Sequence, residues 1–353
     1  MNKTLMTMYV LGHFGVDFAC AFLLFQMVST SEQWYLWLLI YNFCAFALQM
    51  PLGIFADYFN RNVLCATGGC GMIVLAYLTE LTSINYLNGM DMSVLVVVLA
   101  GIGNALFHVG GGIDVLNAGK GNAKLLGLFV APGAFGIYFG TLFGKQDQLA
   151  PYTVPLLLSI IAVFLLWAGY IYGKSFRSDN VPFSLEGIHS REIIVGVLCF
   201  ILVVCIRSYT GMAAHFPWKG QGEWGLVLVC GVVLGKVCGG FFADRFGAKN
   251  TSLISLGLSA LFYLLSGVPI FGTLAVFLFN MTMPITLWGV AQLLKGAKGF
   301  AFGLLTFALY IGFLPIYLNV ELVPVNGVTL ALTAISSIVL LAISLHKVVD
   351  HGG

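Results

Sequence analysis

The chain has 353 residues, of which 59% are hydrophobic and only 8% are charged, against about 25% charged in soluble domains. A water-exposed surface cannot be covered by this small number of charged residues. The composition therefore excludes a soluble globular domain and indicates an all-α polytopic membrane protein. The net charge of +2 gives no sign of a nucleic-acid partner.

The apolar residues fall in blocks of about 20, which is the length that spans a bilayer as a helix. Twelve such helices are predicted, six before and six after the longest polar interruption. In chain order they cover residues 5–28, 34–56, 63–82, 93–116, 125–143, 153–172, 193–216, 224–243, 252–270, 272–294, 299–319 and 327–346.

The polar interruption predicts two six-helix halves. We expect an N-terminal half over residues 1–173, a cytoplasmic linker over 174–190 and a C-terminal half over 191–353. Two six-helix halves in parallel repeat are a transporter architecture.

Basic residues concentrate on one side of the predicted bundle. Loops at that side hold twelve Lys and Arg, whereas the opposite loops hold only Lys145 and Lys219. The positive-inside rule therefore predicts a protein of the cytoplasmic (inner) membrane with both termini in the cytoplasm.

A short motif occurs once in each half. GIFADYFNRN closes the second predicted helix and GFFADRFGAK the eighth, so that Gly53 matches Gly240 and Asp57 matches Asp244. The glycine allows two helices to approach closely. The aspartate can pair with a loop cation or face the positive N-terminus of another helix. A plain helix-ending turn is the alternative.

This repeated motif, with the helix count, resembles the signature of the major facilitator superfamily. The resemblance implies the major facilitator fold, a working monomer, and gating contacts that break when the halves rock apart. The second copy also matches at Gly247. The positions that we take as gating residues are Gly53, Asp57 and Arg61 in the first copy and Gly240, Asp244, Arg245 and Lys249 in the second.

Within that superfamily, GHFGVDF and GIGNALFHVGGG are similar to stretches of the fosmidomycin-resistance-like exporters, which implies efflux. FVAPGAFGIYFG loosely resembles the glycine-rich motif of antiporters. The chain departs from the exporter pattern at Val16, Val109, Gly110 and Ile113. It also has Val97 where many drug antiporters carry arginine, so symport stays open as the mode of transport. The matching residues are His13, Asp17, Gly101, Gly103, Ala105, Phe107, His108, Gly133, Gly136 and Gly140.

Asp17 lies twelve residues into the first predicted helix, about 18 Å along it and near the middle of a hydrocarbon core about 30 Å thick. His13, one helical turn earlier, lies on the same face. A buried carboxylate beside an imidazole can hold a proton. We therefore predict that Asp17 and His13 couple transport to protons; a structural hydrogen bond is the alternative.

Arg207 and Lys236 lie about 21 Å and about 16 Å into their predicted helices, and Asp17 is the only acid predicted at such depth. This excess of positive charge predicts an anionic substrate such as a carboxylate, phosphate or phosphonate, gripped by the guanidinium fork. Alternatively, Arg207 pairs with Asp17, and Lys236 bonds carbonyls or belongs to the gate near Asp244.

His108 lies about 21 Å into the fourth predicted helix, and we predict that it faces the substrate. The glycines around it, Gly101, Gly103 and those at 110–112, indicate either a hinge or close packing on the helix at 34–56. Asp114 is expected at the cytoplasmic rim.

No ATP-binding motif, no nucleophile–base set and no cluster with metal-ligand spacing is present, so we expect no enzyme, no cofactor and no metal site. The sequence thus predicts a secondary active transporter that moves a small, anionic organic molecule by alternating access, in proton-coupled efflux. An uptake symporter or facilitator, or a transport-inactive membrane sensor on the same scaffold, remains the alternative.

Overall fold

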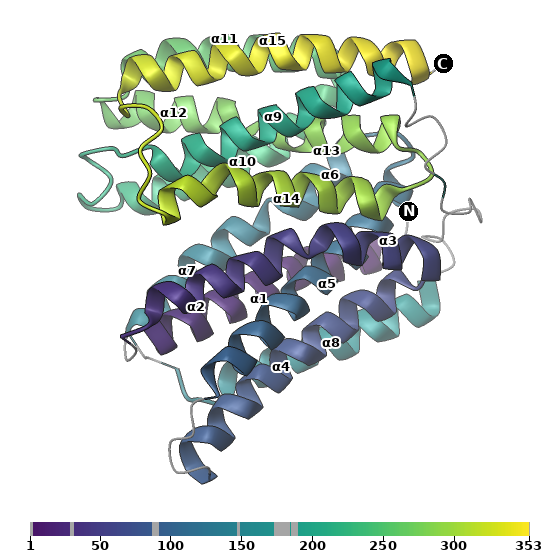
Figure 1. The fold of residues 1–353 in the computed structure, drawn as a ribbon, viewed down its shortest axis with the longest axis vertical. Coiled ribbons are helices and arrows are strands. Elements are labelled where there is room, and N and C mark those ends of the chain that lie inside the picture. The colour runs from purple at the N-terminus through teal and green to yellow at the C-terminus, as the bar shows by residue number, and fades with distance from the viewer. Residues whose placement is uncertain are drawn as a thin grey trace.

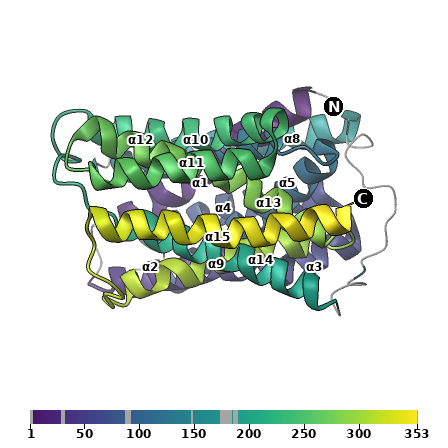
Figure 2. The ribbon, with the colours of Figure 1, turned by 90° about the horizontal axis from the view of Figure 1, so that it is seen from above.

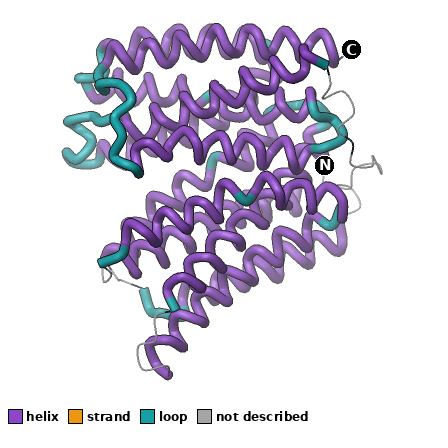
Figure 3. Tube along the Cα trace, in the orientation of Figure 1, coloured by secondary structure: helices purple, strands orange, loops and turns teal. Residues whose placement is uncertain are grey.

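A computed structural model describes residues 3–28, 32–86, 92–146, 149–172, 184 and 190–352. These residues form helices joined by loops, and none of them forms a strand (Figure 3). The elements are α1 (Lys3–Val28), α2 (Trp34–Asn42), the π-helix η1 (Phe43–Ala47), α3 (Gln49–Phe59), α4 (Asn62–Tyr86), α5 (Ser93–Gly119), α6 (Lys124–Val130), α7 (Pro132–Gln146), α8 (Thr153–Tyr172), α9 (Arg191–Ala213), α10 (Trp224–Phe246), α11 (Ala248–Leu264), α12 (Pro269–Asn280), α13 (Thr282–Leu293), α14 (Lys298–Tyr317) and α15 (Gly327–Gly352).

Within the described residues, these elements trace the twelve predicted spans. Eleven spans are long and apolar enough to cross a membrane, judged by length and composition. The remaining span, α11, has 17 residues, which is close to the shortest helix that crosses a hydrocarbon core of about 30 Å.

Three of the predicted spans are interrupted in the structure. The second span passes through the π-helix η1 between α2 and α3. The fifth breaks at Ala131, directly before Pro132, whose ring cannot donate a backbone hydrogen bond. The tenth breaks at Met281, three residues before Pro284. In each case a local backbone change divides a span whose hydropathy is uniform.

Two groups of helices make up the molecule. Figure 1 shows α1 to α8, the N-terminal half, beside α9 to α15, the C-terminal half, with both termini at the same end. Figure 1 shows the long helices of the N-terminal half inclined to those of the C-terminal half, and in the view from above the two groups overlap (Figure 2). The linker predicted over 174–190 lies outside the described residues except Ser184 and Ser190.

Glycines bring α7 against α1 in the N-terminal half. A Cβ added at Gly136 would lie 2.5 Å from the carbonyl oxygen of Phe14, and one at Gly140 would lie 2.4 Å from that of Phe18. The glycine run that resembles an antiporter motif is therefore a helix-packing seam here. It sets the register that places Gly133, one turn earlier on α7, next to Asp17.

The two halves meet mainly where α3 packs on α14 and α6 packs on α10. Both contacts lie at the end of the bundle that carries the termini and the basic loops, which we call the basic end. Arg61, Lys124, Arg245 and Lys298 mark it at the adjoining ends of α4, α6, α10 and α14.

Candidate functional site

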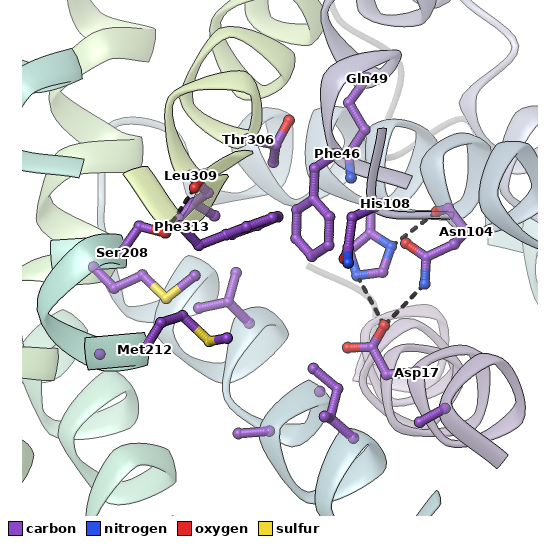
Figure 4. A pocket seen from close by; sticks show the side chains of 18 of the residues that line it. Asp17, Phe46, Gln49, Asn104, His108, Ser208, Met212, Thr306, Leu309 and Phe313 are labelled. Carbon is purple, nitrogen blue, oxygen red and sulfur yellow. Dashed lines mark hydrogen bonds and ion pairs between the residues drawn. The ribbon is translucent and has the colours of Figure 1, made fainter. Parts of the chain in front are cut away.

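A cavity of about 510 Å³ lies between the two halves. Figure 4 shows Asp17, Asn104 and His108 on one side of it and Ser208 and Met212 on the other. The five intramembrane residues that the sequence singled out all line this cavity: His13, Asp17, His108, Arg207 and Lys236.

The N-terminal half contributes a buried cluster of two histidines and one carboxylate. His13 Nε2 lies 3.4 Å from Asp17 Oδ2, and His108 Nε2 lies 3.6 Å from Asp17 Oδ1. The two Nε2 atoms are themselves 3.0 Å apart. All three residues are at most 9% exposed. We call this set, His13, Asp17 and His108, the histidine–aspartate cluster.

Asn104 was not predicted, yet it holds two members of the cluster. Its side-chain amide donates to Asp17 Oδ1 at 3.0 Å, and its backbone carbonyl accepts a hydrogen bond from His108 Nδ1 at 2.8 Å (Figure 4). Asn104 precedes His108 by one helical turn on α5, so its polar side chain at that spacing was the available signal.

Gly133, at the first turn of α7, leaves room beside the cluster. A Cβ added there would lie 2.3 Å from Asp17 Oδ2 and 2.5 Å from His13 Nε2. Any larger residue would therefore fill the space directly in front of these two polar atoms. The sequence showed Gly133 only as part of a glycine run.

The C-terminal half contributes Arg207, from α9, which is 7% exposed. Its Nη1 donates to Thr286 Oγ1 of α13 at 3.2 Å. Within the described part of the chain no carboxylate forms an ion pair with it, so the alternative in which Arg207 pairs with Asp17 is not what the structure shows. Its charge faces the cavity with a neutral partner only.

Lys236, from α10, also lacks a carboxylate partner among the described residues. Its Nζ donates to the carbonyl oxygen of Val130, at the end of α6, at 3.2 Å. A carbonyl contact of this kind is the alternative to substrate binding that the sequence left open for Lys236. The contact joins the two halves, because α6 and α10 belong to different halves.

Asp114 lies near the basic end, as expected, but it is enclosed by protein. It is 2% exposed and accepts hydrogen bonds from the Tyr9 hydroxyl at 2.6 Å and from Asn62 Nδ2, at the start of α4, at 2.8 Å. Asp17 is therefore not the only buried acid.

The hinge predicted in α5 is also not observed, because α5 is unbroken from Ser93 to Gly119. The alternative, close packing, is what the structure shows. A Cβ on Gly101 would lie 2.5 Å from Cys44 of the second span, and one on Gly110 would lie 2.4 Å from the carbonyl oxygen of Asn62 in α4.

The first gating motif closes on the opposite half. Asp57 accepts hydrogen bonds from the backbone N–H groups of Gly299 and Phe300, at 2.8 and 2.9 Å, and so caps the N-terminus of α14. Of the two partners considered for this aspartate, the structure shows the helix N-terminus. Gly53 allows the approach, since an added Cβ would lie 2.2 Å from Gly299 O. Lys298 supports this contact through a 2.7 Å hydrogen bond to Asn117.

The second motif repeats the arrangement. Asp244 accepts hydrogen bonds from the backbone N–H groups of Ala123 and Lys124 at 2.7 and 3.2 Å, at the N-terminus of α6. A Cβ on Gly240 would lie 2.7 Å from Ala123 O. The two copies thus form a pair of crossed contacts, each from one half to the other.

The basic residues of the motifs do not join these contacts. Arg61 and Lys249 form no ion pair among the described residues, and Arg245 lies over the ring of Phe246, 5.4 Å from its centroid. The aspartates and glycines of the motif meet the opposite half, and the cations beside them remain at the surface.

The histidine–aspartate cluster can also hold a metal ion. Its ligand atoms all lie within 4.8 Å of one another, the one such group found in the described part of the chain. Spacing along the chain gave no hint of it, because His108 follows Asp17 by about 90 residues and only the packing of α5 against α1 brings them together.

No family model and no curated protein matches the sequence. Solved structures do resemble it. The E. coli fucose:proton symporter FucP, 13% identical, covers 98% of this chain and 97% of its own at a TM-score of 0.64. The major facilitator superfamily transporter FucP in the outward conformation, also 13% identical, gives 0.54 with 98% and 99% coverage. An outward-facing bacterial homologue of the iron transporter ferroportin, 13% identical, gives 0.61 with 98% of both chains.

These likenesses concern the fold, and they confirm the prediction: the chain has the major facilitator fold. The resemblance to fosmidomycin-resistance-like exporters is not tested by them and stays a prediction.

Proposed function

We propose that this chain is a secondary active transporter, which moves a small anionic organic molecule across the cytoplasmic membrane in exchange for protons. The observation that carries the proposal is the cavity between the halves, where two cations without carboxylate partners face a carboxylate held between two imidazoles.

The alternating-access part rests on the crossed contacts at the basic end. Asp57 and Asp244 each cap a helix of the opposite half, so both contacts must break before the cavity opens at that end. The positive-inside rule makes this end cytoplasmic. The described conformation is then closed toward the cytoplasm, and rocking of the halves exposes the cavity there.

The substrate class follows from charge and lining. Arg207 and Lys236 outnumber Asp17, so an anion in the cavity relieves an excess of positive charge in a medium of low dielectric constant. The guanidinium offers a bidentate fork to a carboxylate, phosphate or phosphonate. Apolar walls such as Phe46 and Phe313 favour an organic molecule over a bare inorganic anion.

Proton coupling is assigned to Asp17 with His13, because a carboxylate enclosed by imidazoles can gain and lose a proton as the halves exchange solvent access. His108 joins them from α5. The solved fucose:proton symporter carries proton coupling in its name, so the fold accommodates it. Efflux is the direction that the exporter resemblance favours.

The test is transport by purified protein in liposomes. A lumen more acidic than the outside should drive uptake of a labelled carboxylate or phosphonate, since outward proton flow then powers inward anion flow. Asp17→Asn should lose the response to pH by more than about tenfold while keeping anion counterflow, and Arg207→Ala should lose both. Lys219→Ala, which removes a cation outside the cavity, is the matched control.

Other outcomes discriminate the alternatives. Uptake driven by an acidic exterior indicates a symporter. Anion binding without counterflow in any gradient indicates a transport-inactive sensor. Full pH-driven transport by Asp17→Asn would contradict proton coupling through that residue.

A further inference from the structure

We infer that the histidine–aspartate cluster binds a divalent first-row transition-metal ion, and that the cargo is an anionic complex of that metal. His13 Nε2, His108 Nε2 and one carboxylate oxygen of Asp17 are the ligands. The metal site stands on the geometry of the cluster alone. The anionic part of the cargo rests on the proposed function.

The donor atoms lie close enough together for one metal ion to join them. Bonds of about 2.0 to 2.1 Å at angles of about 90 to 110° place neighbouring ligand atoms about 2.9 to 3.4 Å apart. The two Nε2 atoms are 3.0 Å apart, and each lies near a different carboxylate oxygen of Asp17, His13 at 3.4 Å from Oδ2 and His108 at 3.6 Å from Oδ1. With one oxygen as the ligand, all three donors lie within 4.8 Å of one another, so a rotation of the carboxylate and small shifts of the imidazoles bring them onto one ion. Two imidazoles and a carboxylate suit Zn²⁺, Fe²⁺, Co²⁺ and Ni²⁺ rather than Mg²⁺ or Ca²⁺.

The outer hydrogen bonds present the lone pair that a metal requires. A backbone carbonyl can only accept, so the 2.8 Å contact with Asn104 O places the proton of neutral His108 on Nδ1. Its Nε2 lone pair then faces His13 and Asp17. Asn104 also fixes Asp17 through its amide. Metal-binding histidines and carboxylates are held by outer hydrogen bonds of this kind.

The space in front of the ligands is kept open. Gly133 stands where a Cβ would lie 2.3 Å from Asp17 Oδ2, and Phe107 and Phe129 stand around the ring of His13, with centroids 6.3 and 4.7 Å from it. These rings wall the cluster on one side, and the cluster lines the cavity on the other. His13 Nδ1 is buried without a hydrogen-bond partner in the described structure, so of the two imidazoles only His108 has an outer hydrogen bond.

The charge of the cavity selects a complex over a bare ion. A divalent cation adds to Arg207 and Lys236 and leaves Asp17 as the sole opposing charge among the residues lining the cavity. An anionic ligand that fills the open coordination positions offsets this excess and reaches the two cations. Protonated imidazoles do not bind metal, so the coupling proton and the metal complex occupy the cluster at different steps.

Co²⁺ binding to the detergent-purified full chain tests the metal site, with purification through a tag that contains no histidine. We expect one saturable site per chain, seen by calorimetry and by the visible absorption of Co²⁺ with nitrogen ligands, and competed by Zn²⁺ but not by Mg²⁺. His108→Gln and Asp17→Asn should abolish it. Asn104→Ala should weaken it about 10- to 100-fold, and His215→Gln, in an exposed loop, should leave it unchanged.

Equal Co²⁺ binding by the wild type and His108→Gln, with matching elution and melting profiles, would overturn the metal site. If the cluster variants misfold, Asn104→Ala provides the test, because it keeps all three ligands. Weaker Co²⁺ binding by an Asn104→Ala protein that melts like the wild type would support the metal site.

Citrate, as a probe anion that chelates Co²⁺, tests the second half of the inference. Co²⁺–citrate should bind at least about tenfold more tightly than either component alone, and Arg207→Ala should lose this gain while keeping Co²⁺ binding. Absence of any gain in the wild type would overturn the anionic complex. These binding measurements do not depend on transport, so the two proposals can fail separately. Co²⁺ binding without counterflow in liposomes would contradict the proposed transport function. Counterflow without site-specific Co²⁺ binding would contradict the metal site.

Discussion

The two faces of the central cavity are built on opposite principles. On the N-terminal face, the charged group has polar partners: Asp17 lies within reach of His13, His108 and the amide of Asn104. On the C-terminal face, Arg207 has a single neutral partner, Thr286. One face therefore surrounds its charge with polar groups, and the other carries charge that the protein itself does not balance.

This difference indicates that the C-terminal face of the cavity is the one whose charge a bound anion would balance. A preorganised cluster costs little to fill with a small ion, because its donors are already held in place. A buried cation without a counter-charge destabilises the ligand-free protein, and binding of an anion removes this destabilisation. The asymmetry predicts that matched substitutions on the two faces have opposite effects on stability.

Asp17→Ala is expected to have the largest effect. Removing the carboxylate leaves the His13 imidazole and the Asn104 amide without their acceptor, and breaking a buried polar pair costs about 3 to 5 kcal/mol of unfolding free energy. Thermal unfolding in detergent measures it. Asp17→Asn, which keeps one oxygen for Asn104, should cost clearly less. Equal melting of Asp17→Ala and the wild type would show that the cluster is not a satisfied unit.

Arg207→Met tests the other face and should move stability in the opposite direction. Methionine fills a similar volume without a charge, and replacing buried ionic groups by apolar ones stabilises by about 1 to 4 kcal/mol in favourable cases; we expect about 2. The same variant should lose the stabilisation by a bound anion, about 2.7 kcal/mol for the wild type at a hundredfold excess over Kd. A lower melting temperature of ligand-free Arg207→Met would mean that Arg207 is structural.

Substitutions at the two gating contacts should differ less in their effects than substitutions at the two faces of the cavity, because both contacts place an aspartate at the N-terminus of a helix of the opposite half. Asp57 is half-buried and Asp244 is exposed, so a charge at a helix N-terminus is worth up to about 2 kcal/mol at Asp57 and about 0.3 to 1 kcal/mol at Asp244. Asp57→Asn should therefore favour opening of the basic end more than Asp244→Asn. Distance measurements between spin labels on α3 and α14, and on α6 and α10, report the populations. A larger effect at Asp244 would contradict this ranking.

Much of the architecture follows from the order of residues. Three signals in the sequence are local or periodic, and each corresponds to a feature of the structure. The twelve apolar blocks correspond to the spans, and the charge bias between alternate loops corresponds to the basic end. The repeated Gly-x-x-x-Asp motif corresponds to the crossed contacts between the halves. The motif even limited the partner of Asp57 to a cation or a helix N-terminus. The π-helix at 43–47 was not visible, because hydropathy does not register a change of backbone hydrogen bonding within an apolar run. The break at Ala131 had a signal in Pro132, which hydropathy alone passes over.

The order of residues was enough to single out the polar side chains that line the cavity, because they interrupt apolar helices: His13, Asp17, His108, Arg207 and Lys236. What each of them contacts depends on how the helices pack. The close packing of α7 on α1 opens the space at Gly133, the position of α5 brings His108 and Asn104 to Asp17, and the enclosure of α5 buries Asp114. Contacts between helices about 90 residues apart depend on helix rotation and register, which glycine packing sets in three dimensions and which no spacing along a single chain records.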